Sequence, residues 1–121
     1  MTEKSISNPE LNLQKSLGTD KIFKFECNVE EGKIRLVLKQ TNINTSNYYE
    51  ANFTLKELCQ INRVFKSCNS LEEVQAHLLI MFKRDSTLLK SLEDDKKIEI
   101  SFKVCLLSNE ENLKLILDRK P

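Results

Sequence analysis

The sequence predicts an α+β fold, an antiparallel sheet or sandwich with a central helical hairpin, in the order β-β-β-α-α-β-β-β. Segments within residues 22–53 and 97–117 alternate apolar and polar side chains with the period of two that is typical of strands with one buried face. Between them, two capping-box sequences precede apolar residues at helical spacing. With 121 residues, 40% of them hydrophobic, the chain can build one domain with its own core.

The first two strands are predicted to form a hairpin. Residues 22–29 and residues 33–39 both place an apolar side chain at every second position. Glu30-Glu31-Gly32 lies between them and is expected to form the turn. Residues 40–47 are rich in Asn, Thr and Ser and predict a loop, after which Tyr48–Phe53 predicts a third strand.

Two helices are expected to follow, each with a capping box at its start. Thr54 can accept the backbone N–H of Glu57 while the Glu57 carboxylate reaches back, and Ser70 with Glu73 repeats this arrangement. The linker between the helices, residues 66–69, is short and predicts a helical hairpin. The apolar residues at helical spacing are Leu55, Leu58, Ile61 and Phe65 in the first helix and Leu71, Val74, Leu78, Met81 and Phe82 in the second.

The last third of the chain returns to the period of two. Lys97–Val104 and Leu113–Leu117 alternate as strands, with Ser108–Asn112 as the turn between them. Thr87–Leu92 either extends the second helix or forms a strand that turns at residues 94–96, and we expect the strand. The predicted core joins the apolar faces of all these elements and includes Phe25, Leu36, Leu58, Phe65, Leu78 and Phe102.

The domain is expected to span residues 22–121, with residues 1–21 as a flexible or partner-docked tail. The tail is polar apart from Leu11, Leu13 and Leu17, which are too few to form a core of their own. Removing residues 1–20 is therefore expected to leave the melting temperature nearly unchanged and to weaken incorporation into an assembly. The candidate partner-binding residues are these three leucines and Tyr48, an aromatic residue at the start of the third strand.

Composition and charge disfavour several classes of protein. The net charge of +1 lacks the basic excess of proteins dedicated to nucleic acids or to membrane surfaces. The longest apolar run, Leu78–Phe82, is far shorter than a membrane span. Residues 1–20 lack the apolar stretch of a signal peptide, so we expect a cytoplasmic protein with reduced cysteines. Cys27, Cys59, Cys68 and Cys105 contain no closely spaced pair, so we expect no metal site.

No motif points to catalysis. The chain has one histidine, His77, and no nucleophile signature, phosphate-binding loop or dinucleotide fingerprint. The acidic pairs fall in predicted turns or in the first turn of a helix, where carboxylates stabilise the structure. We therefore expect no enzyme activity, no cofactor and no small-molecule substrate.

The helical hairpin could belong to a nucleic-acid-binding helix-turn-helix protein. In that motif the second helix approaches phosphates and base edges, but here its first turn carries Glu72 and Glu73. Phosphate would repel this acidic turn, so a nucleic acid partner is the less favoured alternative.

The segment Tyr49–Val74, YEANFTLKELCQINRVFKSCNSLEEV, resembles small globular head domains of ciliate and other protist cytoskeletal proteins. In both, a strand ends in Phe-Thr-Leu, a helix follows, and Ser-Leu-Glu-Glu begins the next helix. More remotely, the order of elements over residues 22–120 resembles the head fold of centriolar cartwheel proteins and DNA end-joining scaffolds. The long coiled-coil helix that accompanies those heads is not found before Pro121. The resemblance implies a fold but no site residues.

These observations predict a non-catalytic protein–protein interaction module, a structural subunit of a larger assembly. The resemblance places it in the cytoskeleton or cilium of a protist. The alternative is an accessory subunit of another stable complex, either mitochondrial or ribosome-associated. The expected partners are other proteins, and no interaction with a membrane is expected. At least one exposed strand edge is expected to be covered in the assembly.

Overall fold

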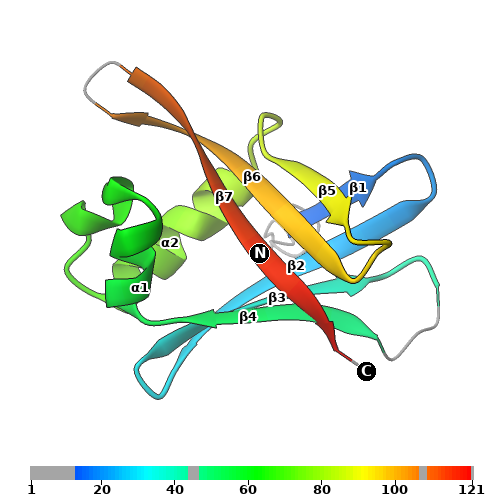
Figure 1. Cartoon of the computed structure of the whole chain (residues 1–121), viewed down its shortest axis with the longest axis horizontal. Helices are drawn as coiled ribbons and strands as arrows, with labels where there is room; N and C mark the ends of the chain where they lie inside the picture. Colours follow the sequence, from blue (N-terminus) through cyan, green and yellow to red (C-terminus); the bar gives the residue numbers. More distant parts are fainter. Residues whose placement is uncertain (1–12, 44–46, 107–108, 121) are drawn as a thin grey trace, which may run out of the picture.

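The computed structural model describes residues 13–43, 47–106 and 109–120. In these residues one antiparallel sheet of seven strands has the order β1-β2-β3-β4-β7-β6-β5, and the helices lie between β4 and β5 in the chain. Figure 1 shows the sheet curled so far that the edge strands β1 and β5 lie side by side at one end, with the helices at the other. The predicted α+β class is therefore confirmed, as one nearly closed sheet and not as two stacked sheets.

The strands are β1 Gln14–Leu17, β2 Lys21–Glu30, β3 Lys33–Gln40, β4 Tyr48–Phe53, β5 Leu88–Leu92, β6 Lys97–Leu106 and β7 Asn109–Lys120. The helices are α1 Leu55–Ile61, the 3₁₀ helix η2 Arg63–Ser67 and α2 Leu71–Phe82. The expected strand over residues 87–92 is confirmed as β5. The last strand is longer than expected, because Glu110 pairs with Cys105 and part of the predicted turn at 108–112 continues the ladder.

The hairpin of β2 and β3 is confirmed with a tighter turn than expected. Glu30 pairs with Lys33, so only Glu31 and Gly32 form the turn. Both have positive φ, 51° and 75°, as a two-residue type I′ turn requires. This turn matches the right-handed twist of the strands and holds the long β2–β3 ladder in register.

The start of the domain differs from the prediction. Residues Gln14–Leu17, assigned to the tail, form β1 and pair with β2 through Gly18, whose φ is 70°. Leu13 and Leu17 are partly buried against the core, whereas Leu11 lies outside the described residues. The sequence does not reveal this strand because it is four residues long and contains only one strongly apolar residue, Leu17.

The helical hairpin is confirmed, but its first helix is shorter than expected. Asn62 has an extended backbone that ends α1, and its side chain accepts the N–H of Val64 to begin η2. Ile61, expected on the buried stripe, is therefore 42% exposed, while Phe65 still reaches the core from η2. The capping box at α1 is complete. At α2 the Ser70 hydroxyl accepts from Glu73, whose carboxylate accepts from Asn69 instead.

Thr54→Ala is expected to lower the free energy of unfolding by about 1 kcal/mol, the usual effect of losing an N-cap side chain. The hydroxyl accepts the Glu57 N–H at 3.1 Å, and alanine leaves that donor without its partner. Urea denaturation measures the change. Lys56→Ala, on the exposed side of the same turn, is the control and should change it by less than ~0.5 kcal/mol. Equal losses in the two variants would contradict a capping role.

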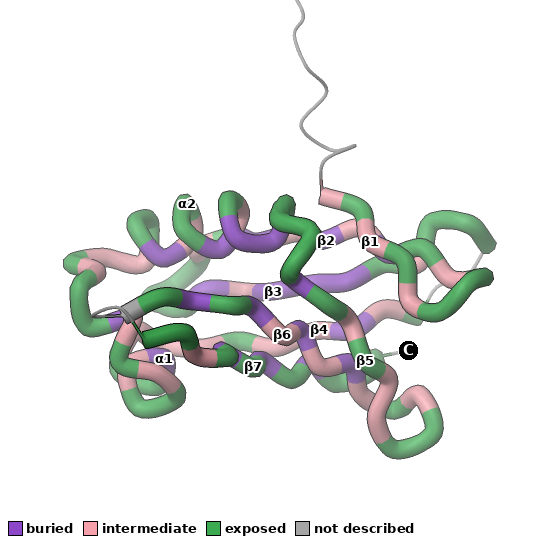
Figure 2. Tube along the Cα trace, turned by 90° about the horizontal axis from the view of Figure 1, so that it is seen from above, coloured by how far each residue is buried: buried purple, intermediate pink, exposed green. Residues whose placement is uncertain are grey.

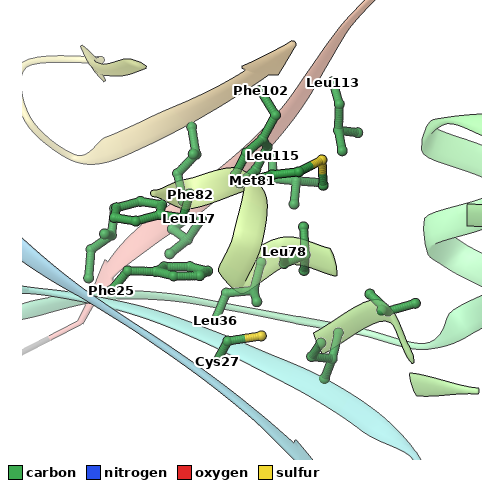
Figure 3. Close-up of a cluster of buried hydrophobic side chains, with 14 of the residues drawn as sticks. Phe25, Cys27, Leu36, Leu78, Met81, Phe82, Phe102, Leu113, Leu115 and Leu117 are labelled. Atoms are coloured by element: carbon green, nitrogen blue, oxygen red, sulfur yellow. The ribbon is translucent and has the colours of Figure 1, made fainter. Parts of the chain in front are cut away.

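The core lies inside the curled sheet and under α2. Figure 3 shows the rings of Phe25 and Phe82 packed together, and they stack at 4.4 Å between centroids. Figure 2 shows buried positions recurring along the strands and on the side of α2 that faces them. The predicted core set is confirmed as one buried cluster: Phe25, Leu36, Leu58, Phe65, Leu78 and Phe102.

Candidate partner-binding site

The predicted partner-binding residues do not form one surface. Leu13 precedes β1, Leu17 ends it, and both are partly buried against the core. Tyr48 is half-buried at the start of β4, where it pairs with Lys120, and two strands separate β4 from β1 in the sheet. The neighbouring Tyr49 is buried in the core, and its hydroxyl donates to the Asp95 carbonyl at 2.7 Å. Burial raises the pKa of Tyr49 and keeps this hydroxyl protonated.

A lysine side chain links β1 to the end of α2 and the turn that follows it. The Lys15 ammonium donates to the Arg84 carbonyl at 2.8 Å and lies 5.4 Å from the centroid of the Phe82 ring. Burial lowers the pKa of Lys15, opposed by the charge of Asp85. Lys15 therefore ties β1 to the end of α2 and the turn that follows it.

A different edge is open on β2. Gln14, the first residue of β1, pairs with Lys24, but β2 continues to Glu30. Within the described part of the chain, residues 25–30 therefore have β3 on one side and no strand on the other. A groove of about 300 Å³ follows this edge, and we call it the edge groove. It is lined by Leu13, Lys24, Phe25, Glu26, Cys27, Asn28 and Leu79.

The backbone polar groups of alternate β2 residues face the edge groove. In antiparallel sheets the N–H and C=O of one residue point to the same neighbouring strand, and the next residue points the other way. Ile22 accepts from the Thr41 N–H beside β3, so the even-numbered residues of β2 face β3. Phe25, Cys27 and Val29 consequently direct their N–H and C=O groups to the edge groove.

One of these groups is already covered by a side chain from α2. The Gln75 amide Nε2 donates to the Cys27 carbonyl at 2.6 Å, which agrees with the direction deduced from Ile22. Figure 2 shows α2 running beside β2, and the two elements are in contact. The Gln75 amide thus satisfies the Cys27 carbonyl, to which no neighbouring strand of the described residues donates a hydrogen bond.

The floor of the edge groove is apolar and its rim is polar. Cys27 is 5% exposed, and burial raises its pKa to about 12, so its thiol is uncharged at neutral pH. Leu79 of α2 and Leu13 are partly buried beside it. On the outer face, Glu26 and Asn28 offer a carboxylate and an amide. An added β-strand forms hydrogen bonds with such a row of backbone N–H and C=O groups and places its apolar side chains on such a floor.

The single histidine lies at a second, smaller pocket of about 70 Å³ between η2 and α2. His77 is exposed there, and Cys68 lines the same pocket. Burial, followed by the charge of Glu73, raises the pKa of the Cys68 thiol. A raised pKa makes the thiolate scarcer, the opposite of what a nucleophilic cysteine needs.

Three further features concern metal binding, membrane spanning and similarity to known proteins. They contain no group of three or more His, Cys, Asp or Glu side chains placed to hold a metal ion. None of their helices is both long enough and apolar enough to cross a membrane. No protein-family model matches the chain, and no curated protein matches it significantly.

Proposed function

We propose that this protein is a non-catalytic protein–protein interaction module, a structural subunit of a larger assembly, and that it accepts a β-strand of its partner at the edge groove. The observation that carries the proposal is that, among the described residues, no strand pairs with residues 25–30 of β2 on the side of the edge groove, which has an apolar floor. Sheet edges with unpaired backbone groups are the usual acceptors of an added strand.

The energetics favour a strand over a small ligand. Phe25, Cys27 and Val29 direct their N–H and C=O groups to the edge groove along about 13 Å of strand, and of these groups the Cys27 carbonyl already accepts from Gln75. An extended peptide satisfies these groups with its own backbone, and each hydrogen bond contributes about 1 kcal/mol net. A compact small molecule cannot follow a row of this length. The partner we propose is therefore another protein.

The kind of assembly follows from the sequence resemblance. The Tyr49–Val74 segment supports a cytoskeletal or ciliary assembly in a protist, and this is the setting we propose. An accessory role in a mitochondrial or ribosome-associated complex is the alternative, and identification of the partner would distinguish the two.

Val29→Pro is expected to reduce recovery of the partner by at least about tenfold, the effect of losing one well-placed backbone contact. Proline removes the N–H that faces the edge groove, and it is tolerated at a sheet edge because β3 does not use that group. The measurement is quantitative recovery of cross-linked partner with the tagged full-length protein from its native cells. The same partner must be recovered with the wild type in every replicate.

Val29→Ala is the matched control, because it removes the same side chain but keeps the N–H. It should recover the partner as well as the wild type, with both variants folded by circular dichroism. Equal recovery with proline and alanine would refute strand addition at this edge. Recovery of the wild-type chain only at its monomer mass would refute the interaction module itself.

A further inference from the structure

Four adjacent strands, β2, β3, β4 and β7, carry polar groups on their inner face at the end of the sheet away from the helices (Figure 1). Buried residues alternate along β2 and β7, and Lys21 and Arg119 continue these two series by one more repeat. Gln40 of β3 pairs with the buried Phe23. Tyr49 of β4 pairs with Arg119, so all four polar side chains lie on the same face.

These side chains line a pocket of about 170 Å³, which we call the end pocket. Its lining includes Lys21, Phe23, Gln40, Tyr49, Asp95 and Arg119. The buried rings of Phe23 and Tyr49 pack edge to face, with 5.8 Å between their centroids, and form its apolar part. The open end of a strongly curled sheet is a common place for a ligand.

Asp95, in the turn between β5 and β6, supplies a carboxylate to the end pocket that is already paired. Its Oδ2 accepts from the Lys21 ammonium at 3.2 Å, and its Oδ1 accepts from the Ser91 hydroxyl. The hydrogen bonds from Ser91 and Lys21 lower the pKa of Asp95, so this carboxylate is charged at neutral pH. Asp95 therefore balances one cation, Lys21.

Arg119 brings a second cation to the same place. Among the described residues it forms no ion pair, and it is exposed, so a ligand can reach its guanidinium from solvent. Burial and the charge of Asp95 raise the pKa of Tyr49, whereas Arg119 and Lys21 lower it, so both cations act on one hydroxyl. Counting the side chains that line it, the end pocket has one positive charge in excess.

We propose that the end pocket binds a small organic carboxylate, held by the guanidinium of Arg119 and the ammonium of Lys21. A guanidinium offers two parallel N–H donors that match the two oxygens of a carboxylate. One negative charge neutralises the excess of one, whereas a phosphate group, with a charge near −2 at neutral pH, would exceed it. This inference is independent of the proposed function, because the end pocket and the edge groove share no lining residue.

The volume of the end pocket limits the size of the ligand. Pockets for drug-sized molecules measure about 300–1,000 Å³, so a pocket of about 170 Å³ suits an acid of only a few carbon atoms. The short apolar part of such an acid would pack on the rings of Phe23 and Tyr49 while its carboxylate meets the two cations. The sequence shows no motif for this site, because its residues come from four strands and a distant turn.

Titration of the full-length protein with sodium butyrate at constant ionic strength, followed by two-dimensional NMR, tests the proposal. We expect saturable shifts of the backbone amide signals of Lys21, Tyr49 and Arg119. Butyramide has nearly the same shape without the charge and should leave these signals unchanged. Equal shifts with the two compounds, or no shift with butyrate, would overturn the carboxylate site. Tighter binding of inorganic phosphate than of butyrate would also overturn it.

Arg119→Gln should weaken butyrate binding at least about tenfold, because it removes the charge and the paired donors. Arg63→Gln is the matched control: it removes the same charge from an exposed arginine that pairs with Glu111, and it should bind butyrate like the wild type. Circular dichroism checks that both variants fold. Equal weakening in the two would show that net charge governs binding and would overturn the site. Should Arg119→Gln not fold, the comparison of butyrate with butyramide on the wild type decides.

Discussion

Phe82→Ala is expected to lower the free energy of unfolding by about 4 kcal/mol, the middle of the range for a buried aromatic residue. Phe82 is fully buried at the end of α2, stacked on Phe25, with the Lys15 ammonium over its ring. Alanine would leave a cavity where α2, β2 and β1 meet, and it would remove both ring interactions. Urea denaturation monitored by circular dichroism measures the loss.

Ile80→Ala provides the control for this prediction. Ile80 lies two residues earlier on the same helix but is 55% exposed, so its loss should cost less than ~0.5 kcal/mol. Similar losses for the two variants would show that α2 does not pack on the sheet through Phe82.

Removal of residues 1–20 is expected to lower the melting temperature by about 10 °C, corresponding to roughly 2 kcal/mol in a domain of this size. The deletion removes β1, the ladder from Gln14 to Leu17 and the Lys15 bridge to Arg84. It also exposes the part of the core under Leu13 and Leu17. This expected result reverses the one drawn from the sequence, in which the same segment was a tail without a structural role.

Removal of residues 1–8 is the control, because it leaves β1 intact. Differential scanning calorimetry should find its melting temperature close to that of the full-length chain. An unchanged melting temperature after removal of residues 1–20 would contradict the contribution of β1 to the fold.

Several elements could be predicted because neighbouring residues in the chain decide them. The β2–β3 hairpin is defined by its own alternation and by Glu31-Gly32, which adopts the positive φ of a type I′ turn. The start of α1 depends on Thr54 and Glu57, three residues apart. The same periodicities indicate which positions are buried, so the core residues could be predicted without knowing which strands pair with each other.

The candidate site could be predicted only in part. Leu13 was singled out as an apolar residue in a polar segment, and it does line the edge groove. The groove itself depends on Cys27 and Leu79, which the sequence presents as ordinary core positions, and on the amide of Gln75. No local signal in the sequence indicates that β2, which has ten residues, pairs on one side with β1, which has only four.

The sequence by itself determined the class of the fold, the hairpin of β2 and β3, the helix starts and which side chains are apolar on which face. Only the tertiary structure decided that β1 joins the sheet, that Lys15 binds the Arg84 carbonyl after α2 and that Ile61 faces solvent. The physical reason is the range of the interactions. Periodicity, turns and caps are set within a few residues, whereas a short polar strand such as β1 is stabilised by the edge of β2 and by a phenylalanine of α2 that is distant in the chain.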